Sequence, residues 1–384
     1  MRGFDEDLLM IPGPTFVPDS TLRAMSRQMI NHRGKKFGEM LTECTENLKK
    51  VFRTKNDLFI LTCSGTGAME AAISNIVEDG DKVLCPVYGK FSERFKLIVE
   101  AFGGKPIELP VEWGDIPQPE LIEEALNREK NVKAVTITQN ETSTGVRVPL
   151  EEISKIVKKH NTLLIVDTIS SMGGDYIPVD DLKIDLCVSG SQKCFSLPPG
   201  LAFISVSQEA WEVIRRTKRR AFYFSLPAYL ESYKKNPPEQ PYTPALTFYY
   251  ALQNSLRLLL EEGLDNVISR HRKVAQATRE AIKALELELF PKREENCSVT
   301  VTAVRIPNGV SDKELREHMQ KEYGILISGG QSKLKGKIFR IGHMGCVTDK
   351  EILATIYALE QSLKKLGQRV EIGAGLEAAI KVFK

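Results

Sequence analysis

Apolar and polar positions along this chain follow two different spacings in turn. Between residues 57 and 206, short apolar runs typical of buried strands lie at 57–62, 82–87, 105–109, 132–138, 162–166, 184–188 and 201–206. Helical patterns lie between the first five runs, at about 67–78, 91–102, 118–128 and 150–159. Strands that alternate with helices predict an α/β fold, in which helices cover both faces of a mostly parallel, seven-stranded sheet.

The pattern changes on either side of this block. Helical periodicity at about 20–29 and 37–52 follows a stiff Ile11-Pro-Gly-Pro14 segment. After residue 206 come a basic run at 215–220, which we interpret as a solvated helix face, a proline-rich loop at 232–244 and a long helix at about 245–262. The remaining runs, helical at about 265–286, 311–323 and 349–366 and strand-like at 298–305, 325–327 and 337–341, predict a smaller C-terminal α/β domain. We therefore expect an N-terminal arm at 1–18, a large domain at 19–262 and a small domain at 263–384.

Composition narrows the class of protein. The chain has 27% charged and 42% hydrophobic residues, which is ordinary for a globular protein, and its net charge of +3 is too small to indicate nucleic acid or an anionic membrane as a partner. The seven cysteines are scattered without a Cys-x-x-Cys pair, the first residues lack a signal-peptide core, and no apolar run is long enough for a membrane span. We expect a cytoplasmic protein without a metal, nucleic-acid or membrane partner.

Two charged residues stand at the ends of buried runs. Ligands of a parallel α/β sheet bind at the carboxyl ends of its strands. Asp167 ends the fifth run, where a carboxylate is costly unless it meets a cation or a donor. Lys193 lies between the sixth and seventh runs, where burial would lower its pKa and leave a nucleophilic amine. A lone lysine between two strands is more often on an exposed turn, so its assignment depends on the other strand ends.

Two further strand ends carry suitable residues. Thr66, Gly67 and Ala68 follow the first strand at the start of a helix, and this arrangement suits a single phosphate. It is not a dinucleotide fingerprint, because Glu70 stands where a third small residue is needed. Phe91 opens the helix after the second strand, where an aromatic side chain either packs in the core or stacks on a flat ring.

Taken together, these strand ends fit one ligand. Pyridoxal 5'-phosphate needs a phosphate cradle, an aromatic face, a carboxylate on its pyridine nitrogen and a lysine for its aldehyde. Arg340 adds a cation inside the apolar strand 337–341. An arginine in such a strand faces a carboxylate, which belongs either to a substrate or to a structural salt bridge.

The motifs as a set carry a family resemblance. They are Pro12-Gly-Pro14, Ser64-Gly-Thr-Gly67, Glu141-Thr-Ser-Thr-Gly145, Val166-Asp167, Ser191-Gln-Lys-Cys194 and Arg340-Ile-Gly342. With them the chain resembles the class V aminotransferases over nearly its whole length, in particular the alanine–glyoxylate and serine–pyruvate or serine–glyoxylate branch. The resemblance implies a fold type I enzyme that depends on pyridoxal phosphate and works as a homodimer, with active sites at the subunit interface. It implies transfer of an amino group from a small amino acid, alanine or serine, to glyoxylate or pyruvate by a ping-pong mechanism.

The resemblance also assigns roles to individual residues. Lys193 would bind the cofactor aldehyde covalently and Asp167 would bind the ring nitrogen, while Phe91 and Ile169 would cover the two ring faces. Thr142 would reach the ring hydroxyl, and Arg340 would bind the substrate carboxylate. The phosphate would be held by Thr66, Gly67, Ala68 and Gln192, with Thr243 contributed by the partner subunit.

Two positions depart from the family pattern. Ala68 stands where some relatives have a histidine, so one side-chain contact to the phosphate is absent. Gln240 stands where certain relatives have a tyrosine shortly before the threonine of the partner subunit, although Tyr242 lies close enough in sequence to substitute.

The nearest alternative is another fold type I activity, such as a cysteine desulfurase or a lyase. The desulfurase branch stacks a histidine on the ring and has a histidine before the lysine, where this chain has Phe91 and Gln192. It also needs a mobile thiol, and Cys346 lies in a turn that looks too short for one. A nicotinamide oxidoreductase is disfavoured by the missing third glycine, and a non-catalytic subunit by the presence of Lys193 together with Asp167.

Overall fold

The seven apolar runs form one sheet. The computed structural model describes residues 7–218 and 221–384. Its large sheet has the order β2-β10-β9-β8-β5-β3-β4, and every strand is parallel to the others except β10, which is antiparallel to both of its neighbours. The bounds are β2 Asp57–Leu61, β3 Lys82–Val87, β4 Lys105–Pro110, β5 Val132–Thr138, β8 Leu163–Asp167, β9 Leu186–Gly190 and β10 Ala202–Val206. The predicted α/β fold with a mostly parallel seven-stranded sheet is confirmed.

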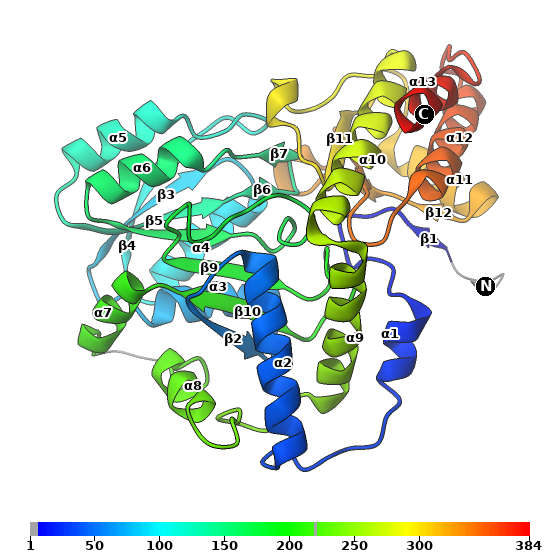
Figure 1. Cartoon of the computed structure of the whole chain (residues 1–384). Helices are drawn as coiled ribbons and strands as arrows, with labels where there is room; N and C mark the ends of the chain where they lie inside the picture. Colours follow the sequence, from blue (N-terminus) through cyan, green and yellow to red (C-terminus); the bar gives the residue numbers. More distant parts are fainter. Residues whose placement is uncertain (1–6, 219–220) are drawn as a thin grey trace.

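Helices cover both faces of this sheet because alternate residues of each strand point to opposite sides. In β2, Leu58 and Ile60 join one apolar cluster and Phe59 and Leu61 join the other. The first face packs against α2 (Lys35–Phe52), α5 (Pro119–Arg128), α6 (Glu151–Lys159) and α9 (Leu246–Glu262). The second face packs against α3 (Gly65–Ser74), α4 (Lys90–Ala101), α7 (Gln208–Arg216) and α8 (Leu226–Tyr233). The layers are visible in Figure 1.

The C-terminal part has a sheet and an apolar cluster of its own. Its antiparallel sheet has the order β11-β14-β13, with β11 Val301–Arg305, β14 Ile338–Gly342 and β13 Ser328–Gly329. The helices α10 (Leu264–Ala284), α11 (Asp312–Tyr323), α12 (Asp349–Lys365) and α13 (Ala374–Phe383) gather beside it, at the end of the molecule coloured yellow to red in Figure 1. The predicted division at 18 and 262 stays a prediction.

The described part of the N-terminal arm connects the two parts of the chain. Strand β1 (Leu8–Leu9) pairs in parallel with β12 (Ile325–Leu326), and the N–H of Gly342 donates to the Met10 carbonyl at 2.8 Å. Five residues further on, the Thr15 Oγ1 donates to the Lys193 carbonyl at 3.0 Å. The arm is therefore fixed to the small sheet at one end and to the lysine turn at the other.

Some elements differ from the expectations. The helix expected at 20–29 is shorter, α1 (Asp19–Ala24), and α13 was not expected. The polar loop after β5 holds a two-residue pair, β6 (Asn140–Glu141) with β7 (Val146–Arg147), and two 3-10 turns lie at Glu294–Asn296 and Ser332–Leu334. Within the basic run, Arg215 and Arg216 end α7, whereas residues 219–220 lie outside the described residues, as do residues 1–6 of the arm. No helix in the described part of the chain combines the length and the hydrophobicity that a bilayer span requires.

The close approach of the arm to β14 generates a prediction about stability. A Cβ added at Gly342 would overlap the carbonyl oxygen and carbon of Ile11, which are backbone atoms that cannot rotate away. We expect Gly342→Ala to lower the free energy of unfolding by roughly 1–3 kcal/mol, as overpacked sites do. Urea denaturation followed by circular dichroism measures this.

A matched control separates this overlap from backbone strain. Gly336 has φ +75° and nothing within 4 Å of an added Cβ, so Gly336→Ala adds strain without overlap. We expect it to cost about 1 kcal/mol. If Gly342→Ala unfolds at the same urea concentration as the wild type, the arm does not lie against β14 in solution.

Candidate active site

The carboxyl ends of the parallel strands surround one cavity. It encloses about 460 Å³ of space, a volume that includes the part open to solvent. Its lining residues come from the segments that follow β2, β3, β5, β8 and β9: Ser64, Gly65, Thr66, Phe91, Arg94, Asn140, Thr142, Asp167, Ile169, Ser170, Gln192 and Lys193. The structure therefore brings together seven of the residues selected from sequence: Thr66, Phe91, Thr142, Asp167, Ile169, Gln192 and Lys193.

Asp167 is a buried carboxylate that no cation among the described residues pairs with. Its side chain ends β8 and is 4% exposed, and its Oδ1 accepts a hydrogen bond from the Ile169 N–H at 2.8 Å. Desolvation raises the pKa of Asp167 to about 7, and Arg94 and Lys193 oppose this rise only in part. Asp167 forms no ion pair with any described residue, so its carboxylate can accept a further donor from a ligand in the cavity.

Lys193 faces the same cavity from the turn between β9 and β10. Burial lowers the pKa of Lys193 to about 8, and the positive charges of Arg340 and Arg94 act in the same direction. Its Nζ donates to the carbonyl of Pro12, and a Cβ on Gly13 would lie 2.6 Å from that nitrogen. An amine with this pKa is substantially neutral just above pH 8, and a neutral amine is a nucleophile.

The start of α3 forms one end of the cavity. Gly65 and Thr66 belong to the first turn of the helix, where N–H groups lack partners within the helix. A Cβ on Gly65 would lie 2.6 Å from Ile169 Cδ1, so a glycine is needed for Ile169 to approach the helix. Gln192 lies at the same cavity, and its Oε1 is buried without a hydrogen-bond partner among the described residues.

Two of the predicted phosphate ligands do not line the cavity. Gly67 donates its N–H to the Ser64 carbonyl at 2.8 Å, and Ala68 is fully buried in the apolar cluster beneath the sheet. The reason is that α3 begins at Gly65 rather than at about residue 67. Their contact with a phosphate stays a prediction.

Glu141 fixes the position of Phe91. The Oε2 of this buried carboxylate accepts hydrogen bonds from the N–H groups of Phe91 at 2.9 Å and Ser92 at 2.8 Å, in the first turn of α4. The Ser143 hydroxyl donates to its Oε1 at 2.6 Å. The pKa of Glu141 is raised because burial disfavours its charged form, and these hydrogen bonds offset only part of that rise. The carboxylate thus caps α4 and holds Phe91 at the cavity wall.

Arg340 lies behind the cavity wall rather than on it. Its Nε and Nη2 donate to the Gly329 carbonyl at 3.0 and 2.7 Å, and its Nη1 donates to the Thr142 carbonyl at 2.9 Å. The side chain is 4% exposed, and burial lowers the pKa of Arg340 to about 10. Arg340 forms no salt bridge with a described residue, so the structural ion pair weighed as an alternative is wrong within that part of the chain.

Thr243 lies away from this cavity and is exposed. Next to it, the Tyr242 ring stacks on Tyr223 with centroids 4.9 Å apart, and its hydroxyl donates to the Phe222 carbonyl at 2.6 Å. Gln240 is buried, and its Nε2 donates to the Ile60 carbonyl at 3.1 Å. Gln240 is therefore engaged within its own chain, as is the hydroxyl of Tyr242.

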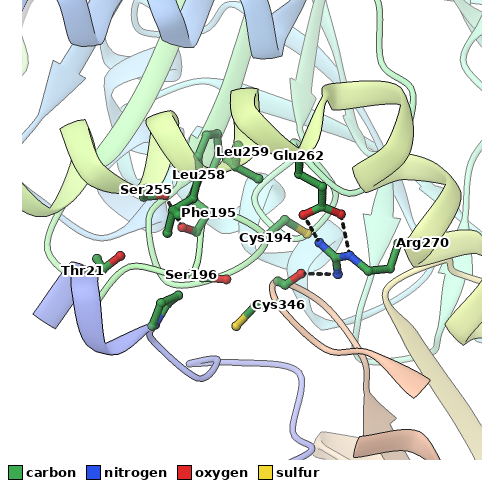
Figure 2. A pocket seen from close by; sticks show the side chains of 12 residues that line it. Thr21, Cys194, Phe195, Ser196, Ser255, Leu258, Leu259, Glu262, Arg270 and Cys346 are labelled. Atoms are coloured by element: carbon green, nitrogen blue, oxygen red, sulfur yellow. Dashed lines mark hydrogen bonds and ion pairs between the residues drawn. The ribbon is translucent and has the colours of Figure 1, made fainter. Parts of the chain in front are cut away.

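A second cavity lies on the other side of the lysine turn, and Figure 2 shows its lining. There Arg270 donates to both carboxylate oxygens of Glu262, at 2.7 and 2.9 Å, and to the Gly345 carbonyl at 2.8 Å. Cys346 lines this cavity and not the one that contains Lys193, and burial raises the pKa of its thiol. This separation argues against the desulfurase alternative. The described residues contain no group of three His, Cys, Asp or Glu side chains able to hold a metal ion.

Sequence reasoning missed five residues of the lysine cavity: Ser64, Gly65, Arg94, Asn140 and Ser170. Arg94 had a usable signal, because it follows Phe91 by three residues and so shares its helix face. Asn140 and Ser170 point at each other, with the Asn140 Nδ2 donating to the Ser170 Oγ at 2.7 Å, and only the fold brings those segments together.

Comparison with known proteins agrees with this architecture. The model of the family described as aminotransferase class-V matches residues 13–348. An uncharacterized aminotransferase of Methanocaldococcus jannaschii is 50% identical, covering 98% of this chain and 97% of its own length. The serine–glyoxylate aminotransferase of Methylorubrum extorquens is 38% identical, and the match covers 97% of this chain and 94% of that protein. The crystal structure of ureidoglycine–glyoxylate aminotransferase from Bacillus subtilis has a TM-score of 0.93 and 34% identity, covering 98% of both chains. The chain belongs to the class V aminotransferases, a family whose fold implies dependence on pyridoxal phosphate.

The lowered pKa of Lys193 generates a prediction about pH. Because the unfolded lysine binds its proton more tightly than the native one, the native state loses stability as pH falls from about 10.5 through 8. The full difference corresponds to roughly 3 kcal/mol. In Lys193→Met this contribution is absent. We therefore expect the unfolding free energy of the cofactor-free wild type, relative to that of the variant, to rise by about 2–3 kcal/mol between pH 7.5 and 10.

Urea denaturation of both proteins across this pH range measures the difference. Lys35→Met is the control, because the Lys35 side chain is 86% exposed. A difference between wild type and Lys193→Met that stays constant with pH would show that the amine is not desolvated in the native state.

Proposed function

We propose that this protein is an aminotransferase that uses pyridoxal 5'-phosphate to move an amino group from a small amino acid, alanine or serine, to glyoxylate or pyruvate. The observation that carries the proposal is the buried Asp167 carboxylate, which forms no ion pair with any described residue and shares a cavity with the Lys193 amine. A pyridine nitrogen that carries a proton is the complementary partner for such a carboxylate.

The residues of the cavity fit the parts of this cofactor. Phe91 and Ile169 supply apolar surfaces for the two ring faces, and Thr142 is assigned to the ring hydroxyl. Thr66 and Gln192 are assigned to the phosphate from within the cavity, together with Gly67 and Ala68 of the same helix. When bound, the cofactor supplies an electron sink for the charge that develops when the amino acid loses its α-proton.

The protein's own groups carry the proton transfers. Lys193 would hold the cofactor through its aldehyde, and its amine would take the α-proton of the substrate as a general base and return it as a general acid. Asp167 would hold the ring nitrogen of the bound cofactor in its protonated form. Arg340 binds the α-carboxylate of the substrate and so fixes the Cα–H bond near the lysine.

The two substrates use the site in turn. An amino acid and an oxo acid both carry an α-carboxylate, so one arginine serves both halves of a ping-pong reaction. The two relatives with named activities share glyoxylate and differ in the amino donor, serine in one and ureidoglycine in the other. This supports glyoxylate as acceptor, with the donor left to be measured.

We also propose a cytoplasmic homodimer with active sites at the subunit interface. Thr243 is exposed and lies beside exposed aromatic side chains, with Phe222 84% and Tyr223 40% exposed. Burial of these rings by a second copy would bring Thr243 to the phosphate of the partner's site. The division into an arm, a large and a small domain at residues 18 and 262 belongs to the same proposal.

An absorbance spectrum followed by a substrate screen tests the function. We expect the purified protein to absorb at roughly 400–430 nm from bound cofactor, and to convert glyoxylate or pyruvate with alanine or serine as donor. Lys193→Ala should lose both this absorbance and the turnover, because no other cavity-lining residue carries an amine. Wild-type turnover by that variant would remove the central assignment.

The assignment of Arg340 gives a separate prediction. Lysine keeps the charge but loses the planar pair of donors, so Arg340→Lys should lower kcat/KM for both the amino donor and the oxo acid by roughly 30- to 1000-fold, or about 2–4 kcal/mol. Steady-state kinetics with both substrates varied measures this, and the cofactor spectrum should not change.

A neighbouring arginine provides the control. Arg305 lies in the adjacent strand β11 with its side chain 46% exposed, and Arg305→Lys should leave both specificity constants unchanged. Loss of cofactor absorbance in Arg340→Lys, without loss of substrate affinity, would assign Arg340 to the structure of the site instead.

A further inference from the structure

Arg94 has no assigned role, yet it lines the cavity that contains Lys193 and Asp167. It lies on α4, one turn after Phe91, and its guanidinium carbon is 4.9 Å from the centre of the Phe91 ring. Its Nη1 donates to the Thr66 Oγ1 at 3.0 Å. The side chain thus reaches from α4 across to the first turn of α3.

The charge of Arg94 is not matched by a carboxylate from the described part of the chain. Arg94 forms no ion pair with a described residue, and its single hydrogen bond there is the one to Thr66. A guanidinium has five N–H donors, and a half-buried one is stabilised by a carboxylate or a phosphate that accepts two of them. Asp167 lies near enough for its pKa to be lowered by Arg94, but not near enough to form a pair.

The end of the cavity to which Arg94 points is the one suited to a phosphate. Thr66 is in the first helical turn of α3, where the helix dipole and the free N–H groups favour an anion. The first turn of the helix supplies no charged side chain there, because it consists of Gly65, Thr66, Gly67 and Ala68. Among the cavity-lining residues, positive charge comes from Arg94 and Lys193, and Lys193 is assigned to the aldehyde.

We propose that Arg94 binds the phosphate group of the cofactor, next to Thr66, and supplies the cation that a phosphate dianion requires. This inference rests on the proposed function, since it names the phosphate as that of pyridoxal phosphate. The contact of Arg94 with Phe91 has a second consequence. The same arginine then packs against the ring that covers one face of the cofactor.

Two ligands that differ only in the phosphate test the proposal. Pyridoxal 5'-phosphate and pyridoxal are titrated into the cofactor-free protein, and binding is followed by absorbance and by quenching of intrinsic fluorescence. Arg94→Met removes the charge and keeps an unbranched side chain. We expect this variant to bind pyridoxal phosphate roughly 10- to 100-fold more weakly, as expected for loss of a charge-assisted hydrogen bond. Its affinity for pyridoxal should stay within about threefold of the wild type, because the ring contacts remain.

Two more variants sharpen the test. Arg94→Lys keeps a cation without the planar fork and should fall between the wild type and Arg94→Met. Arg128→Met is the control for loss of an arginine, because the Arg128 side chain is 68% exposed at the end of α5. Circular dichroism melting of each variant verifies that it is folded before titration.

Each outcome has a distinct meaning. Unchanged affinity of Arg94→Met for pyridoxal phosphate overturns the proposal. An equal loss of affinity for both ligands also overturns it, and assigns Arg94 to the support of Phe91. Failure of the wild type to bind pyridoxal phosphate overturns the proposed function itself, and this is read from the wild-type titration before any variant is compared.

Discussion

The constraint on which this site depends is the desolvation of charged groups that form no ion pair with the described residues. Asp167, Lys193 and Arg340 are each buried or half-buried. Burial favours the neutral form of each group, so it raises the pKa of Asp167 to about 7 and lowers the pKa of Lys193 to about 8 and that of Arg340 to about 10. None of the three forms an ion pair with a described residue. A fold retains such an arrangement at a cost in stability, and a ligand with complementary charges removes that cost when it binds.

The scaffold makes this possible by bringing the ends of several strands together and by fixing the segments that follow them. Parallel strands end at one edge of the sheet, so segments far apart in sequence meet there. Glu141 then caps α4 through the N–H groups of Phe91 and Ser92, while the arm reaches Lys193 through the carbonyl of Pro12. Gly13 belongs to this contact, because any larger residue would bring its Cβ within 2.6 Å of the lysine nitrogen.

The sequence predicted the parts of the site that end apolar runs, because a charged residue at the end of a buried strand is visible in the pattern. Asp167 and Lys193 are such residues, and the structure brings both to one cavity. The apolar pattern predicted that the helix after β2 begins at about residue 67, whereas α3 begins at Gly65. An error of two residues in a helix start changes which residues lie in the first turn. The Ala68 side chain lies in the apolar core, and its contact with a phosphate stays a prediction.

Other parts depend on contacts between distant segments, which no local pattern reveals. The Asn140 side chain meets Ser170 across thirty positions of sequence, and Gln240 is held by the Ile60 carbonyl of β2. The short α1 is a further example, since the apolar spacing at 20–29 suggested a longer helix. In each case the tertiary structure decides between local alternatives.

The hydrogen bonds of Arg340 would couple its proposed binding of the substrate carboxylate to both parts of the chain. Three of its five N–H groups are used, two by the Gly329 carbonyl and one by the Thr142 carbonyl, so one N–H remains on each terminal nitrogen. A carboxylate that accepts these two donors binds a guanidinium already fixed to β13 of the small sheet and to the segment after β5. Such preorganisation reduces the side-chain entropy lost on binding. Because the arginine touches both elements, a shift of either one would change the position of the guanidinium proposed to bind the substrate carboxylate.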